Sequence, residues 1–159
     1  MNAPIISDDP LYQLLRSDNV SAFNQARSEG QTCNLEGCDF KGLDLRNLNV
    51  AGVNLENADL SGANLKGADF SGAYMSNVIL ENTKFGEVNF NGIHMAGQKL
   101  VGVDLNGINF QNAILKGVNF EDSDLTNANL DSAYLNSANL KDVNLTNASI
   151  KNTDLGGAD

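Results

Sequence analysis

Large apolar residues recur at every fifth position over most of this chain. Counting in fives from Leu35, the position named i is apolar in all 25 repeats up to Leu155, without insertion or deletion. Position i−2 is small or β-branched in almost every repeat, i−1 is Asp or Asn in 17 of 25, and i+2 is Gly or Asn in 20 of 25. A period of five fits neither an α-helix of about 3.6 residues per turn nor a strand of about two. It is typical of a solenoid whose every side carries the same unit.

The pattern also predicts which side chains fill the solenoid. Positions i−2 and i lie two residues apart, so both point to the same side of a short extended segment, which must be the interior. Gly or Asn at i+2 permits the left-handed backbone of a corner. Small residues at i−2 leave room for the large one at i, so we expect a filled, narrow lumen without a concave pocket.

The repeated unit, as in Ala58-Asp59-Leu60-Ser61-Gly62, resembles the pentapeptide-repeat protein family. The resemblance extends over residues 33–157. It implies an all-β solenoid in which four pentapeptides form one coil of a right-handed quadrilateral β-helix, which gives about six coils stacked roughly 4.8 Å apart. The period by itself also permits other polygons, so the number four and the handedness come from the resemblance.

The chain divides into a flexible N-terminal arm over residues 1–8, a helical N-terminal cap over residues 9–31 and the repeat solenoid over residues 32–159. In the cap, Asp9 is expected to cap a first helix that has Pro10 at its first position. A second short helix is expected to carry Phe23 inward and to stop at Gly30. These helices would cover the open backbone and apolar side chains of the first coil.

The other end of the repeats has no comparable segment, because residue 159 is reached while the repeats are still in phase. We therefore expect the last coil to be uncovered. Either it pairs with a second copy of the chain, which would give a homodimer, or it stays exposed.

Charge and composition exclude several functions. The net charge is −10 and the pI is about 4.3, so the surface repels nucleic acid phosphates and anionic lipids. We expect no direct nucleic acid binding. No apolar run approaches the roughly 20 residues of a membrane span, and the N-terminus does not resemble a signal peptide. A bacterial or organellar cytoplasmic protein is the expectation.

The exceptions at position i−1 give the candidate binding site. Eight residues there are neither Asp nor Asn, and i−1 side chains point outward. With 20 residues per coil, several exceptions would form an exposed ridge to which a protein partner could bind. The alternative is that stacked large side chains only stabilise the ladder. One column holds Tyr74, His94, Ile114 and Tyr134, and the next face adds Ile79 and Lys99, with Val101 beside them.

Other reactive residues give no catalytic or metal-binding pattern. His94 is the only His, and neither a Ser-His-Asp nor a Cys-His arrangement can be assembled around it. No cofactor or metal is expected. Cys33 and Cys38 lie at i−2 and are expected in the first coil's core, although a disulfide or redox role stays open. Gln98 also lies at i−2, so either a distortion carries its amide outward or the amide bonds to backbone.

These observations favour a non-enzymatic scaffold or protein-interaction module that presents rigid solenoid faces to a macromolecular partner. The family resemblance implies an alternative: some members are regarded as acidic mimics of duplex DNA that bind DNA gyrase. The present sequence is acidic, but it lacks the projecting loops and C-terminal dimerisation helix of the quinolone-resistance members. Lysines also interrupt its surface.

Overall fold

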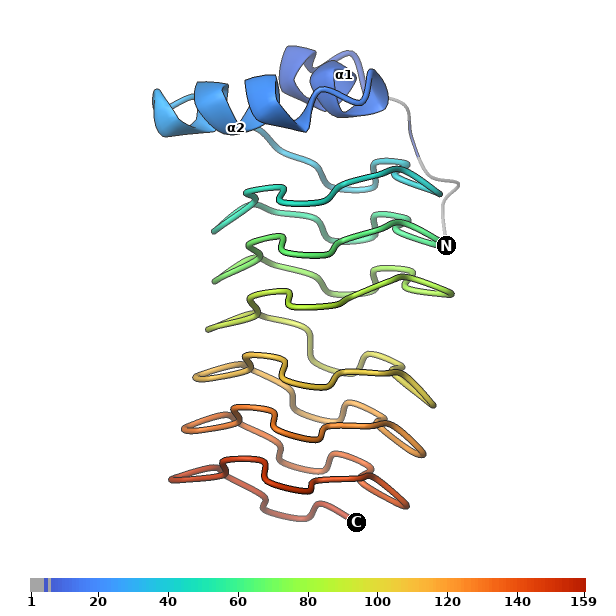
Figure 1. Ribbon diagram of the computed structural model, residues 1–159, viewed down its shortest axis with the longest axis vertical. Helices are drawn as coiled ribbons and strands as arrows, with labels where there is room; N and C mark the ends of the chain where they lie inside the picture. The colour runs from blue at the N-terminus through green and yellow to red at the C-terminus, as the bar shows by residue number, and fades with distance from the viewer. Residues whose placement is uncertain (1–4, 6) are drawn as a thin grey trace.

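The chain forms a rod of stacked coils beneath two short helices (Figure 1). The computed structural model describes residue 5 and residues 7–159. Helix α1 spans Pro10–Arg16 and helix α2 spans Val20–Ser28. In the coils, most sides are joined to the next coil by a single-residue parallel β-bridge, and bridged residues are twenty apart, as in Tyr74 with His94. Each coil therefore consists of four pentapeptides.

The lumen holds the residues at position i, as the period predicts. Every one of them from Leu35 to Leu135 is buried. Phe90 lies at the centre of an aromatic column, with ring centroids 5.7 Å from Phe70 and 5.4 Å from Phe110. Such contacts add to the free energy of burying large apolar side chains.

The corners require a left-handed backbone at i+2. All 25 residues at this position, from Gly37 to Gly157, have positive φ. Gly67 shows a second constraint, since a Cβ atom there would lie 2.6 Å from Asn47 Oδ1 in the preceding coil. Gly and Asn at i+2 are thus explained by the conformation that each corner needs.

The helical cap is built as its sequence predicts. Asp9 Oδ1 accepts hydrogen bonds from the backbone N–H of Leu11 at 2.8 Å and of Tyr12 at 3.4 Å, and Asn19 Oδ1 caps the second helix. The Tyr12 side chain is fully buried, and its hydroxyl donates to the carbonyl of Asp39 at 2.7 Å. Phe23 is also fully buried. The cap therefore joins the core of the first coil.

The arm expected over residues 1–8 is described only in part, because residues 1–4 and 6 lie outside the described residues. Ile5 forms a parallel bridge with Cys38. Its N–H donates to Gly37 O at 2.7 Å, and Asp39 N–H donates to Ile5 O at 3.0 Å. At this residue the chain continues the ladder beyond the first coil.

The last coil of the described chain is less buried than the coils before it. Among its lumen positions, Leu140 and Leu145 are half-buried, whereas Ile150 is 48% exposed and Leu155 is 40% exposed. The two ends of the rod therefore differ in how their lumen is closed.

Candidate functional site: an aromatic ridge and a cleft between coils

Asp and Asn at position i−1 have a structural role at the corners. All 17 of them accept a hydrogen bond through Oδ1 from the backbone N–H two residues later, at 2.8–3.3 Å. This is the Asx turn, in which a side chain replaces a backbone acceptor. The eight exceptions at i−1 lack this bond in the described chain, so no Asx turn stabilises the corner that follows them.

Four of the exceptions stack into a continuous column. Bridges join Tyr74 to His94, His94 to Ile114, and Ile114 to Tyr134. The rings of Tyr74 and His94 lie 4.6 Å apart and are tilted by 34°. We call Tyr74, His94, Ile114 and Tyr134 the ridge.

Exposure is uneven along the ridge. Tyr74 is 45% exposed and Tyr134 is 53% exposed, whereas His94 and Ile114 between them are half-buried. The ridge expected from the sequence is therefore most exposed at its two ends, and at its centre the ring of Tyr74 packs against His94. The ridge presents two aromatic ends with an aliphatic and imidazole centre.

The next face does not form the column expected from Ile79 and Lys99. Ile79 bridges Asp59 in the preceding coil, and Lys99 bridges Asn119 in the following one, but Ile79 and Lys99 do not bridge each other. Ile79 is half-buried, Lys99 is exposed, and Val101 is 45% exposed. The coils that carry these residues have separated at this face.

The separation removes a set of backbone hydrogen bonds. In the other coils the N–H at i and at i+2 donates to the carbonyl nineteen residues later, as Leu60 does to Ile79 at 2.9 Å. Within the described chain, this ladder bond is missing at five positions, namely Asn77, Leu80, Asn82, Phe85 and Glu87. The reverse bond, from the N–H at i−1 to the carbonyl 21 residues earlier, is missing at Lys99, Asp104 and Asn109. The adjoining bridge between residues 84 and 104 is also absent. The two coils remain joined through Tyr74 and His94 on the ridge face.

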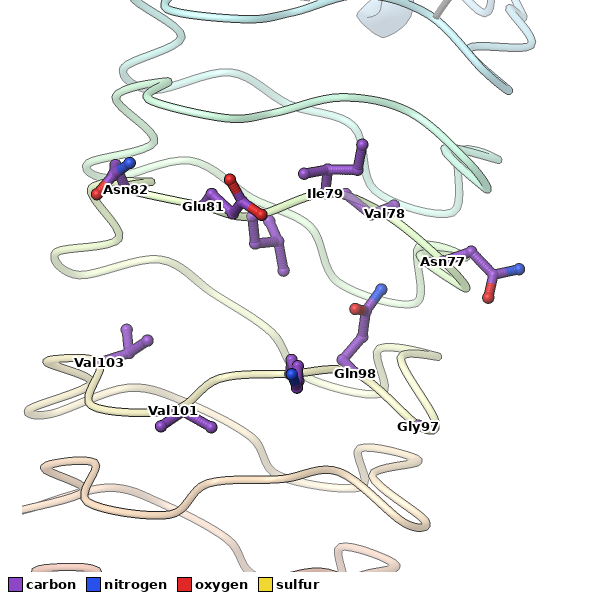
Figure 2. Close-up of a pocket in the computed structure, with 11 residues that line it drawn as sticks. Asn77, Val78, Ile79, Glu81, Asn82, Gly97, Gln98, Val101 and Val103 are labelled. Atoms are coloured by element: carbon purple, nitrogen blue, oxygen red, sulfur yellow. The ribbon is translucent and has the colours of Figure 1, made fainter. Parts of the chain in front are cut away.

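Gln98 stands beside this opening. Its side chain is 8% exposed and points from its own coil toward Val78 and Asn77 of the preceding coil (Figure 2). Its Nε2 donates to the carbonyl of Met75 at 2.7 Å. Of the two alternatives for Gln98, the amide bonds to backbone and is not carried outward, although the ladder next to it is interrupted.

A cleft of about 500 Å³ fills the space between the separated coils. One wall consists of residues 77–82 and the other includes Gln98, Lys99, Val101 and Val103 (Figure 2). The lumen is filled as expected, since every position-i residue from Leu35 to Leu135 is buried. The cleft lies between two neighbouring coils where their ladder is interrupted, and the five-residue pattern did not predict it.

The remaining reactive side chains form no catalytic group. In residue 5 and residues 7–159, no three His, Cys, Asp or Glu side chains are grouped to hold a metal ion. Cys33 is half-buried and Cys38 is buried, and both are free thiols. Burial raises the pKa of the Cys38 thiol to about 11, so this group is protonated and unreactive near neutral pH. Neither described helix is long and apolar enough to cross a membrane.

Sequence comparison accounts for the repeated part of the chain. The family model described as "Pentapeptide repeats (8 copies)" matches residues 32–62, 54–92, 89–127 and 123–159. The chain belongs to the pentapeptide repeat family. Its fold is the right-handed quadrilateral β-helix of that family, with two short helices added at the N-terminus.

Solved structures of pentapeptide repeat proteins resemble this one. HetL, involved in heterocyst differentiation regulation in Nostoc sp. strain PCC 7120, is 29% identical, with 76% of this chain and 61% of HetL covered and a TM-score of 0.36. Rfr23 from Cyanothece 51142 is 26% identical, with 91% and 95% covered and a TM-score of 0.37. QnrB1, a plasmid-mediated fluoroquinolone resistance protein, is 19% identical, with 77% and 76% covered and a TM-score of 0.36. This pentapeptide repeat chain therefore spans less than two thirds of HetL. No curated protein matches the chain in sequence.

One recurring contact was not foreseen from the sequence. Polar residues at i−2 donate to a carbonyl 23 residues earlier: Thr83 to Leu60 at 2.9 Å, and Thr153 to Leu130 at 2.8 Å. Ser123 makes the same contact with Leu100. Gln98 bonds to the equivalent carbonyl with a longer side chain. The signal was present in the sequence as a polar residue at i−2, but the distance to its acceptor depends on how the coils stack.

Proposed function

We propose that this pentapeptide repeat protein is a non-enzymatic, cytoplasmic interaction module and that a protein partner binds the ridge. The observation that supports this proposal is the loss of the Asx turn at four successive coils of one column. At these positions the chain carries aromatic, imidazole and aliphatic side chains in place of Asp or Asn. The replacement is concentrated in one column and is continuous along the rod axis.

The energetics favour binding over a structural role. Each Asx turn contributes a net hydrogen bond of about 1 kcal/mol, so structural requirements alone favour Asp or Asn at i−1. Stacking of Tyr74 on His94 offsets part of this loss, but the two tyrosines still expose about half of their surface. Exposed aromatic residues in a contiguous patch are typical of protein interfaces.

The scaffold would also favour binding by limiting its entropic cost. The ridge residues follow regular bridges in consecutive coils, so their backbone is fixed before a partner arrives. A preorganised aromatic surface loses little conformational freedom on association. This feature would let a narrow ridge bind a partner without rearrangement.

The test replaces Tyr74, Ile114 and Tyr134 with Asn. Each introduced Asn can form the same Asx turn that Asp and Asn form at the other i−1 positions. The variant should therefore be at least as stable as the wild type in chemical denaturation. Proteins captured by the wild-type chain from a bacterial lysate are identified, and the purified candidate is titrated against both forms. We expect the triple variant to lose binding at least tenfold, about 1.4 kcal/mol or more.

The matched control is Lys84→Asn, which restores an Asx turn on a different face. This control should bind the purified candidate as the wild type does. If the triple variant retains wild-type affinity, or if Lys84→Asn weakens binding equally, the ridge is not the interface.

A second candidate function is inhibition or modulation of DNA gyrase by DNA mimicry. The net charge of −10 on a rod-shaped chain supports it. A supercoiling assay with purified gyrase would then show an effect that weakens as salt is raised, because screening removes charge steering. An effect insensitive to salt, or no effect, would dismiss this candidate.

The uncovered last coil supports a proposal about oligomeric state. Ile150 and Leu155 leave apolar surface exposed at the end of the lumen, and a second copy could cover it. Sedimentation at rising concentration should then show a dimer, and Leu155→Asp should return the monomer. A wild-type monomer at the highest concentration would contradict this arrangement.

A further inference from the structure

We propose that the cleft between residues 77–82 and Gln98–Val103 binds an extended peptide segment of a protein partner. This second site lies on the face next to the ridge and does not depend on the ridge being an interface. The segment would be aliphatic at alternating positions and flanked by basic residues. Four features of the cleft support this assignment.

The first feature is a pair of facing backbone edges with unused hydrogen-bonding groups. The ladder would join Leu80 N–H to Lys99 O, Asn82 N–H to Val101 O, and Lys99 N–H to Val78 O, yet none of these bonds forms in the described chain. An unpaired strand edge is a template for another extended chain. The ligand that matches such groups is a peptide main chain, which supplies donors and acceptors along its length.

The second feature is the Gln98 amide. The side chain is more than nine-tenths buried and points into the cleft (Figure 2). Nε2 donates to Met75 O, whereas Oε1 accepts no hydrogen bond from the described residues and is not among the fully enclosed polar atoms. Oε1 is therefore free to accept a hydrogen bond from a ligand in the cleft. A peptide N–H in the cleft would supply the missing partner of Oε1.

Gln98 also explains why the cleft is open. Thr83, Ser123 and Thr153 make the equivalent bond with short side chains. The coils that each of these bonds connects are also joined by β-bridges on the adjacent sides. The donor atom of Gln is two carbon atoms farther from the backbone than the hydroxyl of Ser or Thr. The same bond can therefore form when the two coils lie farther apart. Gln98 thus acts as a prop that holds the two edges apart.

The third feature is the apolar wall inside the cleft. Val78 and Leu80 point into the lumen, and Leu80, at 8% exposed, is the least buried residue at position i before the last coil. Val103 is half-buried on the opposite wall. In an extended ligand, alternate side chains point the same way. Two aliphatic side chains spaced two apart would therefore cover Val78 and Leu80, as i−2 and i do within a coil.

The fourth feature is charge. The chain carries a net charge of −10, and Glu81 is exposed on the rim, while Lys99 is the cationic side chain among those that line the cleft. Electrostatic complementarity therefore favours a segment with basic flanking residues. The cleft volume of about 500 Å³ lies within the usual range of ligand pockets, about 300–1,000 Å³.

The experiment selects displayed random dodecapeptides against the full chain and counter-selects against Gln98→Val. Valine occupies the same lumen column at Val78 and Val118, so this variant should fold and let the ladder close. The ridge variant with Asn at 74, 114 and 134 is the matched control, and it should bind the selected peptides as the wild type does. We expect selected peptides with alternating aliphatic residues and basic flanks, which bind Gln98→Val about tenfold more weakly than the wild type.

Two readouts identify the mode of binding. Hydrogen exchange at the amides of Leu80, Asn82 and Lys99 should slow when the selected peptide is added. A peptide with the same side chains but N-methylated main-chain amides should bind about tenfold more weakly, because the hydrogen bonds to the edges are lost.

Several results would overturn the proposal. They are the absence of any Gln98-dependent peptide from the selection, equal binding of the N-methylated peptide, and peptide protection that maps to the ridge and leaves the cleft amides unchanged. If the amides of Leu80, Asn82 and Lys99 exchange as fast in Gln98→Val as in the wild type, the idea that Gln98 holds the two coils apart is also refuted. Whether the ridge variant still captures the partner of the wild type bears on the proposed function alone, and it does not test the cleft.

Discussion

Ile79 is bridged to the preceding coil but not to the following one. It forms a bridge with Asp59 above it, and its carbonyl accepts a hydrogen bond from Leu60 N–H at 2.9 Å. No bridge links it to Lys99 below. The position-i residues of all three repeats, Leu60, Leu80 and Leu100, are nevertheless buried. Filling the lumen and sealing the ladder are therefore separate requirements.

The closed and open coils also differ at i−2. Closed coils have small or β-branched side chains there, apart from Leu43 and Leu48, whereas the open pair has the longer and polar Gln98. The corner at Gly86 and Glu87 differs too, since both of these residues have positive φ, while the other corners have one such residue. A stacked ladder thus tolerates many outward substitutions, but it is sensitive to the length of one inward side chain.

The largest difference in the free energy of unfolding is expected between truncations of two lumen side chains, one beside the cleft and one away from it. Phe90→Ala should destabilise the rod by about 3–5 kcal/mol, because the ring contacts aromatic neighbours in both adjacent coils and the cavity cannot collapse. Leu80→Ala beside the cleft should cost about 2 kcal/mol or less, since water already reaches that side chain. Denaturant unfolding of both variants measures the difference. Equal losses would mean that the separated face is packed as tightly as the bridged face that carries Phe90.

Gln98→Val should convert the open coils into closed ones. Restored ladder bonds would raise the free energy of unfolding by about 1–3 kcal/mol, after the loss of the amide bond to Met75 is subtracted. Denaturant midpoints compare it with Ser123→Val, which has a similar polar contact in a closed coil and should gain less. A destabilised Gln98→Val would show that the amide bond outweighs the ladder.

Asx turns should matter more where the same side chain is also bonded to a neighbouring coil. Asn109 accepts from Gln111 N–H at 3.1 Å and also donates to Asn89 Oδ1 at 3.1 Å, whereas Asp104, which has no bridge to residue 84, accepts only the local bond from Asn106. Asn109→Ala should therefore cost about 1 kcal/mol, and Asp104→Ala less. Thermal unfolding of the two variants gives the order. A larger loss for Asp104→Ala would indicate that the open pair depends on its turns.

The smallest effects are expected at the corners. Ser132 has φ of 60° and Glu87 has φ of 57°, a conformation that glycine adopts without strain. Ser132→Gly should stabilise the rod by about 0.5–1 kcal/mol. Glu87→Gly should gain less, because the irregular corner beside the cleft is less constrained. Paired denaturation curves would show this, and a larger gain at Glu87 would mean that this corner is the more strained one.

Most of the fold follows from the sequence because one five-residue rule is repeated. The burial of Leu35 through Leu135, the positive φ at the Gly and Asn residues of position i+2 and the cap at Asp9 can all be inferred from local residue types. The ridge column follows too, since 20-residue spacing places Tyr74 below Asn54 and above His94. The half-burial of His94 and Ile114 could not be inferred, because it depends on how side chains of neighbouring coils pack against each other, as Tyr74 does on His94.

The sequence by itself determined the solenoid, its corners and which positions face inward, because backbone alternation and left-handed turns are properties of each pentapeptide. It marked Gln98 as an anomaly without saying how the anomaly would be resolved. The tertiary structure decided that the ladder opens between Ile79 and Lys99 and leaves a cleft there. The separation of two coils depends on the longest side chain between them and on bonds to carbonyls 23 residues away, which no local pattern specifies.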